Sequence, residues 1–484
     1  MSKDANAAVE QLMEALTGRN TLSKNTTVRH AGSEIVLPII NGTPMSAKEG
    51  IYWLKKRMEE DETDVAIYEE LQGAVLDSAV ALDRAIREIY GYSNGVAVPS
   101  FFGSQPPVTI GVPVSSEETI QVVWGRIEIQ GIEGYIETHI NTSGSQPTLI
   151  VAGQVKKKHR ENVSAIVRRA QEMVREKSIY RGQAVKLSFK WHRDGEDFDP
   201  MRHAPSFLSL KGITEDDLLF SDSVKNALNV GLFAPIENAQ ACRDNGIPLK
   251  RGVLLSGPYG TGKTMTAYVS ALKAKRNDWT FIYLDSVEDL REGLEFAAKY
   301  APAVVFAEDL DRLISGKRSM KMDDVLNILD GIDTKGKDII TVFTTNHIEN
   351  INPAMLRMGR LDTLVEVLPP DAKTVEKLVT LYARDLMEEG ADLELIGQSL
   401  EGNIPAFIRE TVERAKLAAI YRTGSGNIKG QVKQEDLLAA ADAMKNHAAM
   451  LKPREEDFKT VQSVVVDFNG ALHGGATKKV ASNG

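Results

Sequence analysis

The middle of the chain is predicted to fold as an α/β domain on a parallel sheet, because three short apolar runs there are each followed by glycine or polar residues. The runs are residues 253–255, 304–307 and 339–344, the last of which includes two threonines. Strands that are apolar along their whole length are typical of parallel sheets covered by helices on both faces. Such sheets gather polar side chains at the carboxyl ends of their strands, where an α/β fold places ligand chemistry.

A glycine-rich turn joins the first run to a predicted helix. In its sequence, GPYGTGKT, four residues separate Gly257 from Gly262, Lys263 and Thr264, which is the P-loop pattern in its strand–loop–helix context. Glycines let backbone N–H groups curl around phosphate oxygens, and the helix N-terminus adds positive potential. We therefore expect ATP here, with Lys263 reaching the β- and γ-phosphates and the Thr264 hydroxyl on Mg²⁺. The predicted nucleotide-binding residues are Gly257, Pro258, Tyr259, Gly260, Thr261, Gly262, Lys263 and Thr264.

Carboxylates follow the second apolar run. Glu308, Asp309 and Asp311 stand directly after it, about forty residues beyond the glycine-rich turn. One carboxylate is expected to hold the Mg²⁺ shell, while its neighbour orients or deprotonates the attacking water. An acidic surface turn is the alternative reading of the same residues.

The third run ends beside an amide and is followed by two arginines. Asn346 can hydrogen-bond the attacking water from the strand end. Arg357 and Arg360 stand three apart beside glycine. In the usual layout of such a nucleotide site, arginines at these positions lie on the side of the nucleotide from which they cannot contact the phosphates bound by their own subunit. We therefore expect each to act as an arginine finger on a neighbouring subunit.

With these motifs, the chain from about residue 207 to 452 resembles an AAA+ ATPase of the AAA clade. The Walker A segment is 257–264, the Walker B strand runs to Glu308 and Asp309, Asn346 is the sensor-1 residue, and a second region of homology ends in Arg357, Arg360 and Asp362. The resemblance implies an ATPase large subdomain over 206–370, a small helical lid over 371–450, and a ring of identical subunits, six by analogy. It also implies ATP and Mg²⁺ as cofactors.

The two Walker B carboxylates depart from the family's pattern. The family has Asp and then Glu, whereas this chain has Glu308 and then Asp309. Glu308 then falls at the Mg²⁺ position with Thr264, and Asp309, one methylene shorter, falls at the position of the catalytic base. The same order occurs in the AAA subfamily of the mitochondrial Rieske-protein translocase, which the segment LNILDGI at 326–332 also resembles.

Two further departures concern the pore and the lid. Members of the family that pull polypeptide through the ring carry an aromatic pore loop between the second strand and Walker B. Here residues 286–301 are predicted to form one helix instead, so we do not expect aromatic side chains that grip a polypeptide in the pore. The turn at 316–319, Gly-Lys-Arg-Ser, is either a basic second pore loop or an ordinary exposed turn. In the lid, Pro405 is placed to begin a helix, which is a sufficient packing reason for its presence. A contact between Arg409 and the nucleotide is the less favoured interpretation of this segment.

The N-terminal 205 residues match no functional motif and are predicted to form an α+β domain that binds a client. Helical periodicity over 4–16 and 47–90 predicts a helical part, residues 1–92. Alternating polarity predicts a strand-rich part, residues 95–190, with an amphipathic helix behind the basic run 156–160 and a strand over 179–189. The basic run is read as a solvated helix end rather than a phosphate site. Residues 451–484 are predicted to be a tail.

Composition limits the class of protein. The 484 residues are enough for two to four domains. The net charge of −9 disfavours a protein whose main task is coating nucleic acid. A single cysteine, Cys242, excludes an internal disulfide framework and fits a reducing cytoplasm. No apolar run reaches the length of a membrane span, so we expect a cytoplasmic protein without membrane association.

The leading functional hypothesis is an ATP-hydrolysing ring that remodels or disassembles a protein client, whose identity the sequence does not give. A DNA-processing AAA+ motor or loader is the first alternative, and its nucleic-acid partner is disfavoured by the acidic charge. A nucleotide-gated scaffold that hydrolyses slowly is the second, because the Walker B order is swapped. A monomeric P-loop kinase is the third, but it would not need Asn346, Arg357 and Arg360 in this arrangement.

Overall fold

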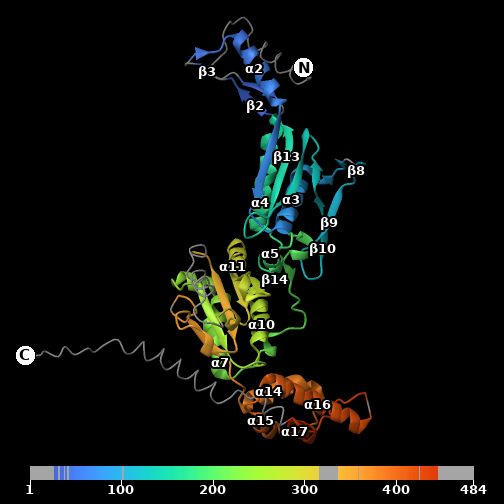
Figure 1. The fold of residues 1–484 in the computed structure, drawn as a ribbon, viewed down its shortest axis with the longest axis vertical. Helices are drawn as coiled ribbons and strands as arrows, with labels where there is room; N and C mark the ends of the chain where they lie inside the picture. Colours follow the sequence, from blue (N-terminus) through green and yellow to red (C-terminus); the bar gives the residue numbers. More distant parts are fainter. Residues whose placement is uncertain are drawn as a thin grey trace, which may run out of the picture. The chain divides into compact units, whose positions relative to one another are not determined.

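The computed structural model of the chain describes residues 27–30, 33–37, 39–40, 43–100, 103–314, 336–357, 359–424 and 426–444. The chain divides into two compact units, Met1–Ile179 and Tyr180–Gly484. Figure 1 shows both, with the sequence running from blue to red. Each unit has its own sheet and its own buried core, so the two are described separately.

The first unit is built on a five-stranded antiparallel sheet in the order β5-β13-β12-β11-β6. Helices α3 and α4 pack on each other, and both contact the sheet. The sheet strands are β5 (Asp64–Leu71), β6 (Asn94–Gly95), β11 (Arg126–Glu128), β12 (Gly134–Asn141) and β13 (Thr148–Lys156). The helices of this unit are α2 (Ala47–Asp61), α3 (Val75–Tyr90) and α4 (Arg160–Glu176).

Strand β5 corrects the prediction that residues 1–92 are helical. It lies between α2 and α3, and its residues alternate in burial: Ile67 and Leu71 are buried, whereas Tyr68 is 71% exposed. This period of two is the pattern of a strand with one covered face. The other short strands are paired in hairpins: β1 (Thr27–His30) with β2 (Ser33–Val36), β3 (Ile39–Ile40) with β4 (Thr43–Pro44), β7 (Val98–Ser100) with β8 (Gly103–Gln105), and β9 (Val108–Pro113) with β10 (Thr119–Trp124).

The basic run after β13 is paired with acidic side chains of the same unit. Lys157 Nζ lies 3.3 Å from Glu60 Oε2, and Lys158 Nζ lies 2.7 Å from Glu62 Oε1. Lys156 is likewise 2.8 Å from Asp64. These contacts agree with the reading of this run as a structural helix end.

The second unit contains a seven-stranded sheet in the order β15-β14-β17-β18-β19-β16-β20. All neighbouring pairs are parallel except β14 with β15. The α/β fold class predicted from the sequence is confirmed. The strands are β14 (Ala184–Leu187), β15 (Ser206–Phe207), β16 (Arg251–Ser256), β17 (Thr280–Leu284), β18 (Ala303–Ala307), β19 (Ile339–Thr345) and β20 (Thr363–Glu366).

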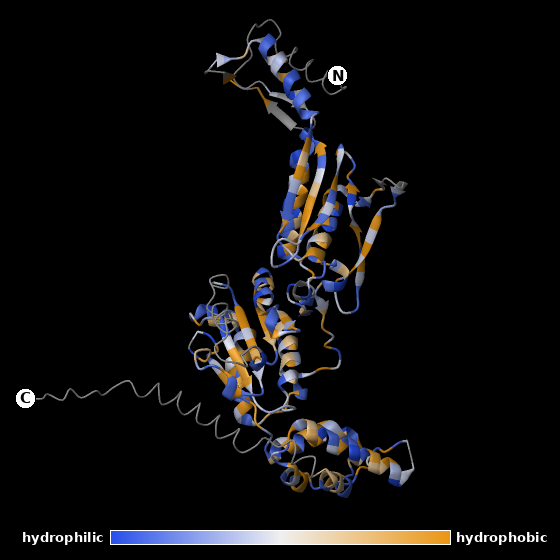
Figure 2. Ribbon diagram, in the orientation of Figure 1, coloured by the Kyte–Doolittle hydropathy of each residue, from blue (hydrophilic) through white to orange (hydrophobic). Residues whose placement is uncertain are grey.

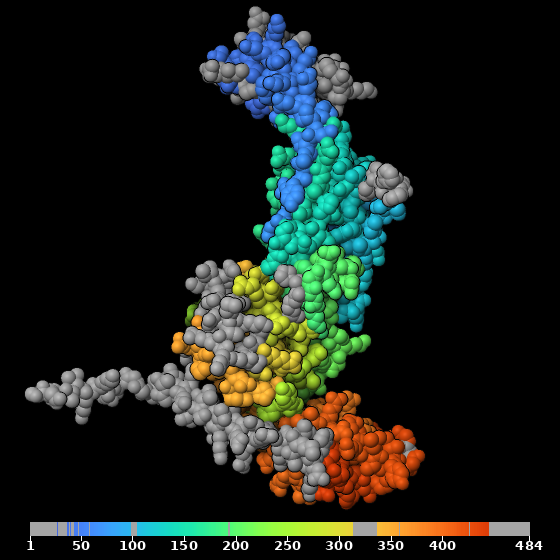
Figure 3. Space-filling model, in the orientation of Figure 1, coloured from blue at the N-terminus to red at the C-terminus, as the bar shows by residue number. Residues whose placement is uncertain are grey.

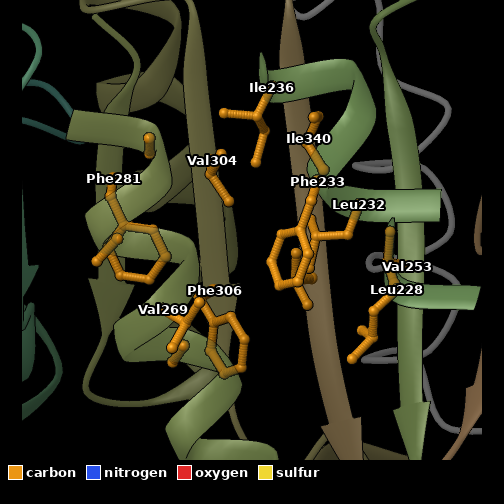
Figure 4. Close-up of a cluster of buried hydrophobic side chains, with 14 of the residues drawn as sticks. Leu228, Leu232, Phe233, Ile236, Val253, Val269, Phe281, Val304, Phe306 and Ile340 are labelled. Atoms are coloured by element: carbon orange, nitrogen blue, oxygen red, sulfur yellow. The ribbon is translucent and has the colours of Figure 1, made fainter. Parts of the chain in front are cut away.

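Helices on both sides of this sheet bury its apolar side chains. Figure 4 shows the centre of the core, where Phe281 and Phe306 of neighbouring strands lie near Val269 of α10. Figure 2 shows the same strands as apolar along their length. The helices are α5 (Lys190–Asp194), α6 (Pro200–His203), α7 (Asp222–Leu228), a π-helical turn (Asn229–Phe233), α8 (Ala234–Glu237), α9 (Ala239–Asp244), α10 (Lys263–Arg276), α11 (Leu290–Lys299) and α12 (Asp311–Ile314).

Four helices beyond the sheet form a small all-helical body with a separate core, coloured orange to red in Figure 3. The Asp371 carboxylate accepts the Thr374 N–H at 2.9 Å and so caps the first of them, while Pro405 begins the third. These are the residues assigned to a lid. The helices are α14 (Ala372–Ala383), α15 (Leu393–Leu400), α16 (Pro405–Thr423) and α17 (Gln434–Ala443).

The boundary between the units differs from the predicted position after residue 205. Residues 180–205 belong to the second unit, because β14 pairs with β17 and extends the parallel sheet by one strand. Only residues 184–187 of the strand predicted over 179–189 are extended in this way. The segment predicted as one helix over 286–301 contains a 3-10 turn (Val287–Asp289) and then α11.

Some predictions fall outside the described residues. These are the helix at 4–16, the turn at 316–319, the segment 326–332 and the tail at 451–484. Among the residues that are described, no helix has both the length and the apolar composition needed to cross a membrane.

Candidate functional site

The glycine-rich turn lies at the carboxyl end of β16, between neighbouring strands β19 and β20. Gly262 has φ of +105° and ends the turn where α10 begins, a conformation that side chains with a Cβ rarely adopt. A Cβ on Gly257 would overlap the carbonyl oxygen of Val367, because β20 passes very close. The pattern of glycines therefore has a steric reason at both ends of the turn.

Lys263 points back into this turn. Its Nζ donates to the carbonyl oxygens of Gly257 at 2.6 Å and Pro258 at 2.7 Å, and the residue is only 8% exposed. Burial lowers the pKa of Lys263 to about 8, although the carboxylates of Asp309 and Glu308 act in the opposite direction. The ammonium is thus held by weak neutral acceptors at the place where a phosphate would supply stronger, charged ones.

Thr264 and Glu308 form the next contact along this edge. The Thr264 hydroxyl, in the first turn of α10, donates to Glu308 Oε1 at 2.7 Å. Burial raises the pKa of the neighbouring Tyr283 hydroxyl, and the charge of Glu308 adds to this effect. A hydroxyl and a carboxylate oxygen side by side are hard oxygen donors of the kind Mg²⁺ prefers, so these two residues fit the predicted metal position.

Asp309 faces the other predicted catalytic group. Asn346 Nδ2 donates to Asp309 Oδ1 at 3.1 Å, and Arg312 lies 2.6 Å from Asp309 Oδ2. Asp309 has φ of +56°, which is uncommon for a residue with a side chain but less so for aspartate. The two carboxylates therefore point to different partners: Glu308 to the hydroxyl of the P-loop helix, and Asp309 to the amide after β19.

A third carboxylate, which the sequence reading left without a role, fixes the end of β19. Asp311 is 9% exposed and accepts the Thr345 hydroxyl at 2.8 Å and the Asn346 N–H at 3.4 Å. In the sequence, Asp311 is noticeable only because it stands two residues after Asp309. Its contact with the end of β19 becomes visible only in the fold. Asp311 thus contacts Asn346 through its backbone N–H and not through its side-chain amide.

Comparison with known proteins agrees with this geometry. The sequence profile of the ATPase family associated with various cellular activities (AAA) matches residues 253–368. The chain contains an AAA domain. The match runs from the strand before the glycine-rich turn, through both carboxylates and Asn346, to the residues after β20. It confirms the family resemblance found in the motifs. The closer likeness to the Rieske-protein translocase subfamily stays a prediction.

Three curated proteins each match between 38% and 46% of the chain. The chain is 30% identical over 249 residues to a proteasome-activating nucleotidase of Saccharolobus solfataricus, which is 46% of this chain and 61% of that protein. It is 28% identical over 209 residues to a 26S proteasome regulatory subunit 8 homolog of Schizosaccharomyces pombe, covering 38% and 51%. A 26S proteasome regulatory subunit 4 homolog of Encephalitozoon cuniculi is 29% identical over 252 residues, covering 46% and 57%. The chain thus spans about half to three fifths of these relatives.

The two arginines of the AAA domain differ in their surroundings. Arg357 is exposed, whereas Arg360 is half-buried and its Nη1 donates to the carbonyl oxygen of Ala354 at 2.8 Å. The structure does not bring either together with Lys263 through a contact within this chain's described residues. Arg357 is therefore the arginine whose side chain faces solvent in the single chain.

The segment before α7 was missed by the motif reading. Phe220 packs against the core of the AAA sheet, and its ring would lie 3.2 Å from a Cβ on Gly262. The adjacent Leu219 packs instead against the core of the helical body. Across the turn, the Ala406 N–H donates to the carbonyl oxygen of Gly260 at 3.4 Å. Apolar side chains from both bodies thus meet beside the P-loop. Only tertiary packing reveals this, since Leu219-Phe220 is an ordinary apolar pair in the sequence.

Proposed function

We propose that the protein binds and hydrolyses ATP and uses the cycle, as a ring of identical subunits, to remodel a protein client. The observation that carries the proposal is the arrangement at the carboxyl edge of β16, β18 and β19. There, Lys263, the Thr264–Glu308 pair and the Asp309–Asn346 pair converge from three strands of one sheet. This arrangement supplies a phosphate cradle, a metal position and a water position within one site.

The roles of the residues follow from their contacts. Backbone N–H groups of the turn and the Lys263 ammonium bind the phosphates, and Thr264 with Glu308 would hold Mg²⁺, which when bound neutralises phosphate charge. Asp309 orients the attacking water and accepts its proton, while the Asn346 amide, which donates to Asp309 Oδ1, also hydrogen-bonds the water. Phe220 and the residues of the helical body that border the turn provide an apolar surface for the base of the nucleotide.

A neighbouring subunit completes the site. Arg357, exposed on the turn after β19, would neutralise charge on the transferring phosphoryl group of the next subunit. Arg360 is proposed to share this role once its bond to the Ala354 carbonyl opens. A ring of six identical subunits is the assembly that the sequence resemblance implies. The client is proposed to be a protein because the named relatives are proteasomal nucleotidases and regulatory subunits.

Complementation of two inactive variants tests the shared site. Arg357→Ala removes the arginine and keeps the P-loop, while Lys263→Ala does the opposite. Each alone should hydrolyse ATP poorly, and a mixture should recover part of the wild-type rate, because an intact P-loop meets an intact arginine at mixed interfaces. Native mass spectrometry establishes that mixed oligomers form. If they form and stay inactive, the arginine does not act between subunits.

The kind of client is tested by stimulation of the same ATPase. A denatured model protein should raise the turnover number, and neither single- nor double-stranded DNA should do so. Stimulation by DNA alone would favour the loader or motor reading instead.

A slowly hydrolysing, nucleotide-gated scaffold is a second candidate, and one observation favours it. Asp309 is the shorter of the two acidic residues and is already paired with Arg312 at 2.6 Å. A turnover number well below one per minute in the assembled oligomer, with tight ATP binding, would favour the scaffold.

A further inference from the structure

The turn that carries Asp309 is tied to the end of a neighbouring strand by one threonine. The Asp309 N–H donates to the Thr344 hydroxyl at 3.1 Å, and the next N–H, that of Leu310, donates to the Thr344 carbonyl oxygen at 2.9 Å. Thr344 is almost fully buried in β19. Both polar groups of one residue thus bind consecutive N–H groups of the turn.

This double contact falls where the backbone is least favourable. A residue with a side chain at φ of +56° costs free energy, so it persists only where the surroundings fix it. The carboxylate of Asp309 reaches Asn346 in this conformation, at 3.1 Å. Aspartate has one methylene fewer than glutamate, so its reach depends more on the direction in which the backbone points it.

We infer that Thr344 is a positioning residue for hydrolysis, whose hydroxyl holds the Asp309 backbone left-handed and so brings a short carboxylate to the water site. The inference rests on the proposed role of Asp309 as the base. Without the hydroxyl, the Asp309 N–H loses its acceptor and the turn can relax to an ordinary conformation. The P-loop follows another strand, β16, and its Gly257 N–H is bound to β19 through the Thr345 carbonyl oxygen and not through the Thr344 hydroxyl. Phosphate binding should therefore not depend on the Thr344 hydroxyl.

The same strand offers a matched control. Thr341 is also buried in β19, but its hydroxyl donates to the Arg251 carbonyl oxygen at 3.3 Å, at the other end of the strand. Thr341→Val and Thr344→Val therefore remove the same group from the same strand, and only the second touches the turn. Thr344→Ser keeps the hydroxyl and loses only a methyl group.

The experiment compares these three full-length variants by steady-state ATPase kinetics, by binding of a fluorescent ATP analogue and by thermal unfolding. Thr344→Val should lower kcat by roughly 10- to 100-fold, the range for a misplaced catalytic group. Its Kd for the analogue should stay within about twofold of wild type, and its Tm should match that of Thr341→Val. Thr344→Ser and Thr341→Val should keep kcat within about threefold.

Three outcomes would overturn the inference: wild-type kcat in Thr344→Val, equal losses in the Ser and Val variants, or a loss that Thr341→Val shares. Asp309→Asn separates this failure from failure of the proposed function. If Asp309→Asn is inactive while Thr344→Val is not impaired, only the role of Thr344 fails. If Asp309→Asn keeps the wild-type rate, the proposed base itself is wrong and the inference falls with it.

Discussion

The two sheets of this protein teach different lessons about what a sequence displays. In the AAA sheet, β18 and β19 are buried along their whole length, so β18 appears as an unbroken apolar run and β19 as an apolar run interrupted only by threonines, each with polar residues just beyond its end. In the N-terminal sheet, β5 is buried on one face only and alternates. The first pattern indicates both a strand and the candidate site residues that follow it. The second marks a strand weakly and gives no site.

Substitutions in β5 should produce the largest effect on stability, and they test whether this sheet serves structure alone. Leu71→Ala should lower the free energy of unfolding of the first unit by about 2–5 kcal/mol, because Leu71 is fully buried. Tyr68→Ala, on the exposed face of the same strand, should change it by less than about 0.5 kcal/mol. Chemical denaturation of the full chain, with the binding of an ATP analogue as a second readout, measures both. A change in analogue affinity in Leu71→Ala would break the comparison.

Asp309→Asn should give the largest effect on activity. The amide has the shape of the carboxylate but accepts no proton, so turnover should fall by at least about 10²-fold while ATP stays bound. Glu308→Gln should instead weaken binding and the Mg²⁺ requirement together, because Glu308 lies beside the Thr264 hydroxyl. Single-turnover assays with a Mg²⁺ titration distinguish the two. The reverse pattern would mean that the two carboxylates exchange roles.

Lys263→Ala should act on binding. It removes the buried ammonium that the turn holds with two carbonyl oxygens, so ATP affinity should fall by one to two orders of magnitude, about 1.4–2.8 kcal/mol. Equilibrium binding of the nucleotide measures the loss. Unchanged affinity would remove the P-loop assignment altogether.

The pKa of Lys263 predicts a smaller effect that needs no substitution. Burial lowers this pKa to about 8 in the free protein, so the ammonium is mostly charged at pH 7 and is lost as the pH rises through 8. Phosphate binding requires the charged form, so kcat/KM should fall about tenfold for each pH unit above that value. At saturating ATP the bound phosphate keeps the lysine charged, so kcat should not fall in the same way as the pH rises above 8. A fall in both kcat and kcat/KM at the same pH would mean that a group other than Lys263 titrates.

The sequence was informative where local chemistry and strand burial coincide. The glycine-rich turn, Glu308, Asp309 and Asn346 were found because each follows an apolar run at a fixed spacing. Asp311 and Thr344 were not assigned roles, because their partners lie some 35 residues away in sequence and depend on the pairing of β18 with β19. The boundary after residue 205 was misplaced for a related reason. A four-residue strand such as β14 gives no sign of which sheet it joins.

Strand β14 also anchors the beginning of the second unit in its sheet. The chain leaves the first unit at Ile179 and, within a few residues, is built into the sheet beside β17. Just before that strand, the Arg181 guanidinium donates to the carbonyl oxygens of Lys299 and Ala301, in the segment that leads into β18 and its carboxylates. The first residues of the second unit are therefore held in place both by the pairing of β14 with β17 and by the Arg181 guanidinium.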